Sequence, residues 1–293
     1  MTIDQVINIL VTITLFEMMI TIGLGVTFSQ IADVARDRGL VARAAIANYV
    51  LVPGAAVALL LLYHAHPLVA AGFLIAAVCP GAPYGPPFTA MAKGNVPQSV
   101  GLMVTLAASS AIVAPLLLKF LLPWMAGNQP LHVNVGKMVF TLILSQLLPL
   151  SIGLFFRQSR PALAEKLKNP GSKLSTVLNL VVFGLIIAVQ YKTLAAIRPL
   201  GFLGMFVLAI AALAAGWLLG WPGTSARKAM GLTTGVRNVG VSLVIATGSF
   251  PGTPAISAAL AYAVFQTIVL ALIALAWGRM SPEKATVPGV ATT

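Results

Sequence analysis

The chain consists of long runs of apolar residues separated by short polar links. Apolar runs of about 18 residues or more predict membrane-spanning helices, because a helix satisfies its own backbone hydrogen bonds in lipid. Only the links at 29–40 and 157–172 are sizeable, so no extramembrane segment is long enough to fold alone. Nine spans are predicted, at 5–28, 41–63, 67–92, 96–122, 134–156, 173–191, 199–220, 226–249 and 254–277.

The composition agrees with this pattern. The 293 residues are 59% hydrophobic and only 8% charged, with a mean hydropathy of +0.97, whereas a soluble globular domain carries about 25% charged residues. We therefore expect an all-α integral membrane protein with one domain over residues 1–280, in two halves at 5–122 and 134–277. The first apolar run is too long for a signal peptide and is expected to be retained as a span. Residues 281–293 are expected to form a disordered cytoplasmic tail.

The net charge of +12 does not indicate a nucleic-acid partner, because the basic residues do not form a groove-sized patch. They indicate orientation instead. Four flank spans on the side of the N-terminus and thirteen on the other side, which the positive-inside rule places in the cytoplasm. We expect a multi-pass protein of the cell (inner) membrane with the N-terminus outside and the C-terminus in the cytoplasm. The four are Lys119, Lys137, Lys192 and Arg198, and the thirteen are Arg36, Arg38, Arg43, Lys93, Arg157, Arg160, Lys166, Lys168, Lys173, Arg227, Lys228, Arg279 and Lys284.

Two of the spans contain helix-breaking residues near their middle. The third holds four prolines between Pro80 and Pro87, and proline removes a backbone donor and clashes with the preceding turn. The eighth holds Gly231-Leu-Thr-Thr-Gly-Val-Arg-Asn-Val-Gly240, which places Arg237 inside the membrane. Broken helices at membrane depth survive only against protein or a water-filled cavity. A pair of them in corresponding places of two halves indicates the binding site of a secondary transporter.

The motifs at these breaks resemble those of the bile acid:sodium symporter family and its bacterial relatives. The matching elements are Cys79-Pro-Gly81, Ala92-Lys-Gly-Asn-Val96 and Gly235-Val-Arg-Asn-Val-Gly240, within a resemblance that runs from Leu15 to about Trp277. The resemblance implies two inverted repeats of five helices each. Some members of the family lack the first helix, which would leave the nine spans predicted here. It also implies a core domain that crosses two unwound helices, and a panel domain that moves against it during alternating access.

The resemblance also implies sodium sites, but several of their residues differ here. The family's Ser-Asn pair aligns with Gly85 and Pro86, and a sodium-site threonine aligns with Met103, although Ser99 is kept. The central glutamate aligns with Thr233. The glutamine that follows it in the family is Arg237 here, and a further glutamine is Asn48. Sodium and an always-charged guanidinium should not share this space, so we expect no sodium binding of the family's kind.

The cargo expected from these changes is a small organic anion, because the site gains a positive charge and loses its acid. Arg237 is interpreted either as the anchor for that anion or as a built-in cation, and a structural role on freed carbonyls stays open. Glu17 lies near the middle of the first span and is a candidate for proton coupling or for a pair with Arg237, and a third alternative is that it only faces an aqueous cavity or the hydroxyls of a neighbouring helix. The candidate substrate-binding residues are Arg237, Asn238, Thr233, Thr234, Ser99, Asn48, Tyr84, Gly85 and Pro86, and Phe88, Tyr262 and Gln266 could line a cavity or serve packing.

Other function classes have less support. An arsenite-type efflux carrier of the same fold would use a cysteine in the first break, where Cys79 lies, but the flanking residues follow the bile-acid pattern. A membrane receptor that binds without transport would normally carry a signalling domain. No nucleophile–base set, metal cluster or phosphate loop indicates an enzyme, a metal or a cofactor. We therefore expect proton symport or uniport of a small anion, with the lipid bilayer as the other partner.

Overall fold

A computed structural model describes residues 2–125, 131 and 133–280, and every regular element in this part is a helix. Eight of its helical stretches are long and apolar enough to cross a membrane, and α5 is a shorter apolar helix. The expected all-α membrane fold is confirmed. The elements are α1 (Ile3–Gly25), α2 (Phe28–Arg36), α3 (Arg38–Ile46), η1 (Ala47–Leu51), α4 (Val52–Leu62), α5 (Pro67–Ala77), α6 (Gly85–Met91), α7 (Val96–Met125), α8 (Val135–Leu142), η2 (Ile143–Leu147), α9 (Leu148–Ser159), α10 (Pro161–Ala195), α11 (Pro199–Leu219), α12 (Thr224–Gly235), α13 (Val239–Ser249) and α14 (Pro254–Met280).

The two sizeable polar links are largely helical, which sequence patterning did not indicate. The link at 29–40 contains α2, which begins with a capping box between Thr27 and Gln30. Its Val34 packs on α7, where a Cβ added at Gly101 would overlap the valine side chain. The link at 157–172 is taken up by the end of α9 and by the first turns of α10, a helix of 35 residues. Tertiary packing and capping therefore order segments whose charge suggested loops.

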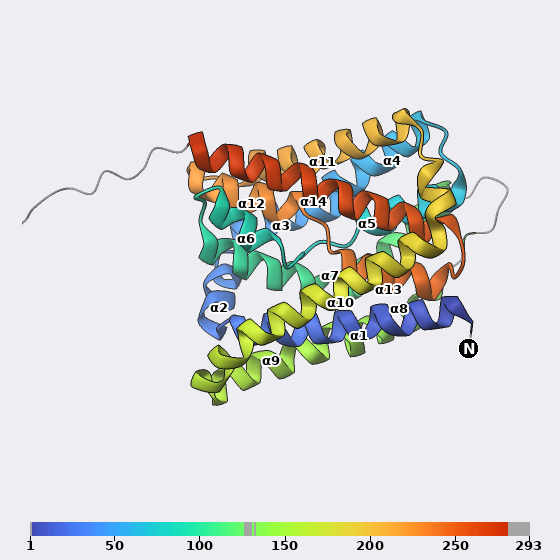
Figure 1. Cartoon of the computed structure of the whole chain (residues 1–293). Coiled ribbons are helices and arrows are strands. Elements are labelled where there is room, and N and C mark those ends of the chain that lie inside the picture. The colour runs from blue at the N-terminus through green and yellow to red at the C-terminus, as the bar shows by residue number, and fades with distance from the viewer. Residues whose placement is uncertain (1, 126–130, 132, 281–293) are drawn as a thin grey trace, which may run out of the picture.

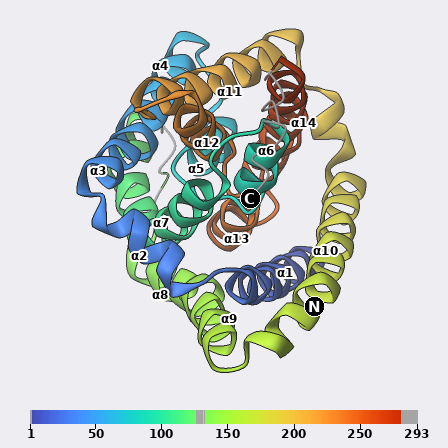
Figure 2. The same cartoon turned by 90° about the vertical axis from the view of Figure 1, so that its left-hand side faces the viewer.

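The helices form two groups that lie side by side. In Figure 2, α1, α9 and α10 form one side, while α5, α6, α12, α13 and α14 form the other. Figure 1 shows the N-terminus at the same end of the molecule as the α4–α5 link, the α10–α11 link and the end of α13. Small residues allow the closest contacts, since a Cβ on Gly153 of α9 would overlap the Ile20 carbonyl of α1, and one on Gly72 of α5 would overlap the Ala255 carbonyl of α14.

Both expected helix breaks are present. The first separates α5 from α6 between Ala77 and Gly85, and it turns through Gly81 at φ +78, a conformation that favours glycine. A Cβ at Gly81 would also overlap the backbone of Ala107 in α7. The second separates α12 from α13, where Val236 has extended backbone dihedrals. Each break therefore leaves a helix C-terminus and a helix N-terminus inside the molecule.

Two wide helical turns accompany prolines in other spans. The π-helical segment η1 runs directly into Val52-Pro53, and η2 runs directly into Leu148-Pro149. Proline lacks the N–H that an α-helical turn would use, so a wider turn before it is a local way to accommodate it. These segments carry buried amide side chains, Asn48 in η1 and Gln146 in η2. The amide of Asn48 is thereby presented toward the second break.

Candidate functional site

The two unwound segments contact each other through Asn238. Its backbone N–H donates to the carbonyl of Cys79 at 2.7 Å, and its Nδ2 donates to the carbonyl of Gly81 at 3.1 Å. Its Oδ1 accepts from the N–H of Val241 at 3.2 Å, which caps α13. One asparagine therefore satisfies carbonyls that the first break frees and a donor that the second break frees.

Arg237 lies at this crossing and is 0% exposed. Nη1 donates to Oδ1 of Asn48 at 2.7 Å and to the carbonyl of Thr234 at 3.0 Å. Nη2 donates to the carbonyl of Ala77 at 2.7 Å, and Nε lies 3.5 Å from the carbonyl of Ala76. These carbonyls belong to the last turns of α5 and α12, whose negative ends attract a positive charge. The guanidinium is thus surrounded by neutral oxygen atoms of the protein.

The backbone of Arg237 is held from α14. Gln266 accepts from the Arg237 N–H at 3.2 Å and donates to the Arg237 carbonyl at 3.1 Å, so its amide forms a two-point clamp on the unwound residue. Tyr262, one turn earlier, is also fully buried, and its hydroxyl has no hydrogen-bond partner among the described residues. Gln266 is therefore a support of the crossing rather than the wall of an open cavity.

A chain of hydroxyl groups lies beside the guanidinium. Ser99 Oγ is 2.7 Å from Thr233 Oγ1, and Thr89 Oγ1 lies 3.0 Å from Ser99 Oγ and 2.9 Å from the carbonyl oxygen of Gly85. Gly85 allows this approach, since a Cβ there would lie 3.3 Å from the Cα of Thr233. Sequence reasoning missed Thr89, although its position one turn after Gly85 on a half-helix was a usable signal. Thr234, the next residue after Thr233, accepts from Asn48 Nδ2 at 3.1 Å, and Asn48 Oδ1 in turn accepts from the guanidinium.

The remaining residues expected near the site are placed differently. Pro86 is buried in the first turn of α6, and its side chain has no polar group. Tyr84 precedes that helix, is partly exposed, and stacks on Phe88 with a centroid distance of 6.3 Å. Cys79 is a buried free thiol at the first break.

Glu17 does not pair with Arg237. Its carboxylate accepts from Thr21 at 2.8 Å and from Ser175 of α10 at 2.6 Å, so it joins α1 to α10. In the part of the chain that the structure describes, Arg237 has no carboxylate within salt-bridge distance. The hypothesis of a direct Glu17–Arg237 pair is therefore wrong for this conformation, and proton coupling at Glu17 stays a prediction.

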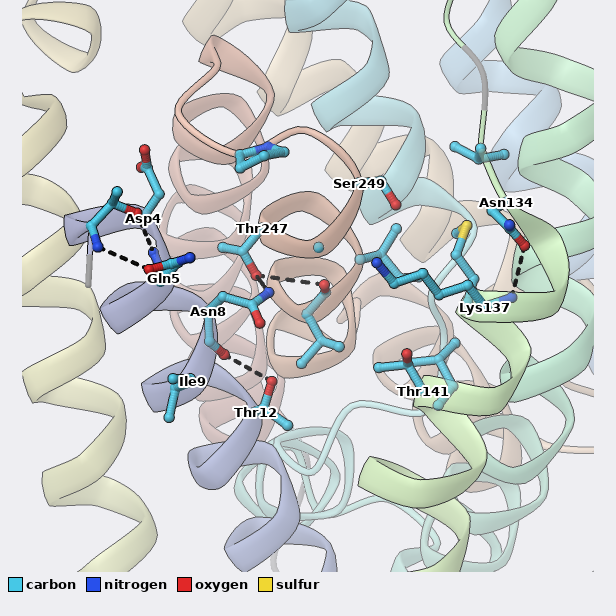
Figure 3. A pocket seen from close by; sticks show the side chains of 18 residues that line it. Asp4, Gln5, Asn8, Ile9, Thr12, Asn134, Lys137, Thr141, Thr247 and Ser249 are labelled. Carbon is cyan, nitrogen blue, oxygen red and sulfur yellow. Dashed lines mark hydrogen bonds between the residues drawn. The ribbon is translucent and has the colours of Figure 1, made fainter.

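An open cavity of about 980 Å³ lies between α1, α8 and α13 at the end of the molecule that carries the N-terminus. Figure 3 shows Asn8 of α1 donating to Thr247 Oγ1 of α13 across it, at 2.9 Å, with Lys137 of α8 beside the same space. Sequence reasoning did not single out these residues, because polar residues near span ends are ordinary at a membrane surface. The lining residues are Thr2, Asp4, Gln5, Asn8, Ile9, Thr12, Val133, Asn134, Lys137, Met138, Thr141, Leu142, Val244, Ile245, Thr247, Gly248, Ser249 and Pro251.

The cavity and the crossing are separated by an apolar layer. Val244 lines the cavity, and Asn238 lies six residues earlier in sequence, about 9 Å away along a helix. Between them, a Cβ on Gly240 of α13 would lie 3.0 Å from both the Leu15 and the Met18 side chains of α1. Leu15 and Met18 are buried. The contact of α1 with α13 therefore separates the crossing from the open cavity at the N-terminal end of the molecule.

Comparison of the sequence with known proteins identifies the family of the chain. A model of the sodium bile acid symporter family matches residues 12–217. The chain belongs to this family. The match includes the first break, and Arg237 lies beyond its end. Among relatives, the chain is 28% identical over 223 residues to the Bacillus subtilis (strain 168) protein YbaS, covering 72% of this chain and 70% of YbaS.

A second Bacillus subtilis relative, the uncharacterized sodium-dependent transporter YocS, is 25% identical over 285 residues, which cover 93% of this chain and 84% of YocS. Membership of the sodium bile acid symporter family confirms the resemblance that the motifs at the breaks indicated. With the apolar helices, it identifies a multi-pass membrane transporter, and the members of this family are transporters rather than enzymes.

Proposed function

We propose that the protein moves a small organic anion by alternating access and does not use sodium in the way its family name suggests. The observation that carries this proposal is the complete enclosure of Arg237 by neutral oxygens of the protein. Oxygen atoms of this kind are the ligands that hard cations use. The guanidinium therefore takes the part of a bound cation that never dissociates.

Enclosure also argues against Arg237 as the anchor for the cargo in this conformation. An anion could reach the guanidinium only by displacing Asn48 or a backbone carbonyl. Lys137 is better placed, because it lines the open cavity and has no salt-bridge partner among the described residues. We assign the first binding of the anion to this cavity, where the amides and hydroxyls of Asn8, Thr141 and Thr247 offer neutral hydrogen bonds.

Movement of α13 relative to α1 would then change the side of the membrane to which the binding site opens. The Asn8–Thr247 bond and the contact of Gly240 with Leu15 and Met18 join these two helices. Breaking one neutral hydrogen bond costs about 0.5–1.5 kcal/mol, so the closure can be reversible.

We further propose that the N-terminal end faces outward, as the distribution of basic residues predicts. Alkaline phosphatase fused after Leu131 should then be active, and fused after Arg160 inactive.

The coupling ion is tested in proteoliposomes. A panel of labelled small carboxylates and sulfonates is offered with an inward sodium gradient, an inward proton gradient, or potassium on both sides. We expect saturable uptake that sodium does not stimulate at fixed pH. Severalfold stimulation by sodium would overturn our interpretation of Arg237. It would favour sodium-dependent transport, which the name of YocS gives for that protein. If protons stimulate uptake, Glu17→Gln should remove that stimulation.

The same experiment separates the remaining alternatives. Saturable binding without flux in any gradient would indicate a receptor rather than a carrier. Arsenite efflux that is lost in Cys79→Ser would indicate the arsenite-type carrier. We expect flux with the anion panel. We expect no arsenite efflux, because Cys79 is fully buried and offers no accessible thiolate to a metalloid.

A further inference from the structure

A second cavity lies away from the crossing. It has a volume of about 640 Å³ and lies between the ends of α4 and α10 and the starts of α5, α11 and α14, at the end of the molecule that carries the N-terminus. Its walls are mostly hydrocarbon. The apolar lining residues are Ala56, Leu59, Leu60, Ala65, Val69, Phe73, Ala196, Ile197, Leu200, Met205, Leu208, Pro254, Ala258 and Ala261.

The polar lining residues come mainly from two links. Arg198 belongs to the α10–α11 link, and its guanidinium has no hydrogen-bond or ion-pair partner among the described residues. His64 and His66 belong to the α4–α5 link and are exposed. His66 Nδ1 accepts from the backbone N–H of Leu68 at 3.4 Å, which leaves its Nε2–H as a donor. Each of these three side chains therefore offers N–H groups at the edge of an apolar space.

Three helices begin at this same edge. The helices α5, α11 and α14 start at Pro67, Pro199 and Pro254, and His66 and Arg198 are the residues that directly precede the first two. Helix N-termini carry partial positive charge and favour anions. The charge of the edge is therefore positive from side chains and from backbone together, while the interior is apolar.

The apolar wall continues onto the outside of the helices. Leu200 lines the cavity and is 51% exposed, and Leu62, next to the α4–α5 link, is 70% exposed. In a membrane protein such exposed leucines face lipid chains. A ligand with a long hydrocarbon part could enter from the bilayer without crossing water, whereas a small polar anion would gain little from these walls.

We propose that this cavity binds an anionic phospholipid from the leaflet at the N-terminal end. One acyl chain occupies the apolar space, and the phosphate accepts hydrogen bonds from Arg198 and from His66 Nε2. This site is separate from the cavity around Lys137, so the proposal does not depend on which anion is carried or on the coupling ion.

The test is a lipid titration of the full-length protein in detergent, followed by native mass spectrometry. Phosphatidylglycerol and phosphatidylcholine with identical chains are compared on the wild type, on Arg198→Gln and on Lys192→Gln. Lys192 is a matched control, because it is an exposed basic residue of the same region that does not line the cavity. We expect the wild type and Lys192→Gln to prefer phosphatidylglycerol, and Arg198→Gln to bind it about fivefold more weakly, as expected for one basic residue near a lipid surface.

A second variant tests the apolar part of the site. Ala261→Leu places extra volume in the wall, and we expect it to weaken both lipids by the same factor. Arg198→Gln should weaken the anionic lipid more than phosphatidylcholine, whose phosphate is balanced by its own choline cation. Thermal unfolding of each variant checks that it is folded. Equal binding of the two lipids by the wild type would overturn the proposal. So would equal losses in Arg198→Gln and Lys192→Gln, or displacement of the lipid by a transported anion.

Discussion

Replacement of Asn48 by alanine tests whether the guanidinium depends on its neutral oxygen partners. Asn48 Oδ1 accepts from Arg237 Nη1 at 2.7 Å, and Asn48 Nδ2 donates to Thr234 Oγ1 at 3.1 Å and to the Ala44 carbonyl at 2.9 Å. All of these groups are buried, so water does not replace the lost partner in the folded protein. Alanine removes the side-chain amide and leaves the charge of Arg237 in place.

The expected cost follows from these bonds. A hydrogen bond to a charged group contributes about 1.5–3 kcal/mol, and a neutral one about 0.5–1.5 kcal/mol. The bond to Arg237 and the bond to Thr234 together give about 3 kcal/mol as a central value. At about 3 °C per kcal/mol for a chain of this size, the unfolding temperature should fall by about 9 °C.

The assay is thermal unfolding of the purified protein in detergent, with Asn169→Ala as the control. Asn169 is exposed on α10 and makes no side-chain hydrogen bond to a described residue, so its loss should change stability by less than about 0.5 kcal/mol. Asn48→Asp keeps an acceptor facing Nη1 and should recover part of the loss. If Asn48→Ala unfolds at the same temperature as Asn169→Ala, Asn48 is not an essential partner of the guanidinium and the account of Arg237 as an enclosed cation is refuted.

Three further predictions concern cation exclusion, anion binding and packing. A sodium ion about 4 Å from the Arg237 guanidinium would be repelled by about 4 kcal/mol. Exchange of potassium chloride for sodium chloride at constant ionic strength should therefore leave the unfolding temperature unchanged, and a sodium-specific rise would contradict this. Lys137→Gln should reduce anion uptake at low substrate concentration severalfold. Lys119→Gln is the control, since Lys119 is exposed and lies outside the cavity; equal uptake by the two variants would remove Lys137 from the pathway. Gly72→Val should lower the free energy of unfolding by at least about 1–3 kcal/mol, because the added side chain overpacks α5 against the Ala255 carbonyl. A Cβ at Gly54 meets no atom within 4 Å, so Gly54→Val should fold normally, and fluorescence-detected size exclusion would report the difference.

The breaks could be predicted from sequence because their causes are local. Prolines between Pro80 and Pro87 and the glycines around Arg237 act on their own backbone, whatever packs around them. The apolar spans were equally local, since they required only apolar length. The described residues hold eight helices long enough to cross a membrane, and the count of nine stays a prediction. The apolar-length pattern did not give α2. Its capping box between Thr27 and Gln30 is a local signal that this pattern does not use, whereas its packing on Gly101 of α7 is tertiary.

The partners of the candidate site residues depended on tertiary structure. The Ala77 carbonyl becomes a partner of Arg237 only because the two breaks cross, and no sequence spacing indicates that contact.

The charge count treated Lys228 as a surface residue that reports orientation. Its amine is in fact buried and donates to the carbonyl of Ala92 at 2.8 Å, at the C-terminal end of α6. A positive charge there stabilises the helix end, so this lysine has a structural role besides its place in the count.

The enclosure of Arg237 has an energetic consequence for a carrier. A cation fixed by covalent bonds returns with the protein in every cycle, so it stabilises the crossing but takes no free energy from an ion gradient. An anion carried alone would then follow its own electrochemical potential. For a monovalent anion, a membrane potential of 100 mV, negative inside, favours exit by about 2.3 kcal/mol, or about fiftyfold in concentration. Without a co-transported proton, such a carrier would work as an exit route under the resting potential.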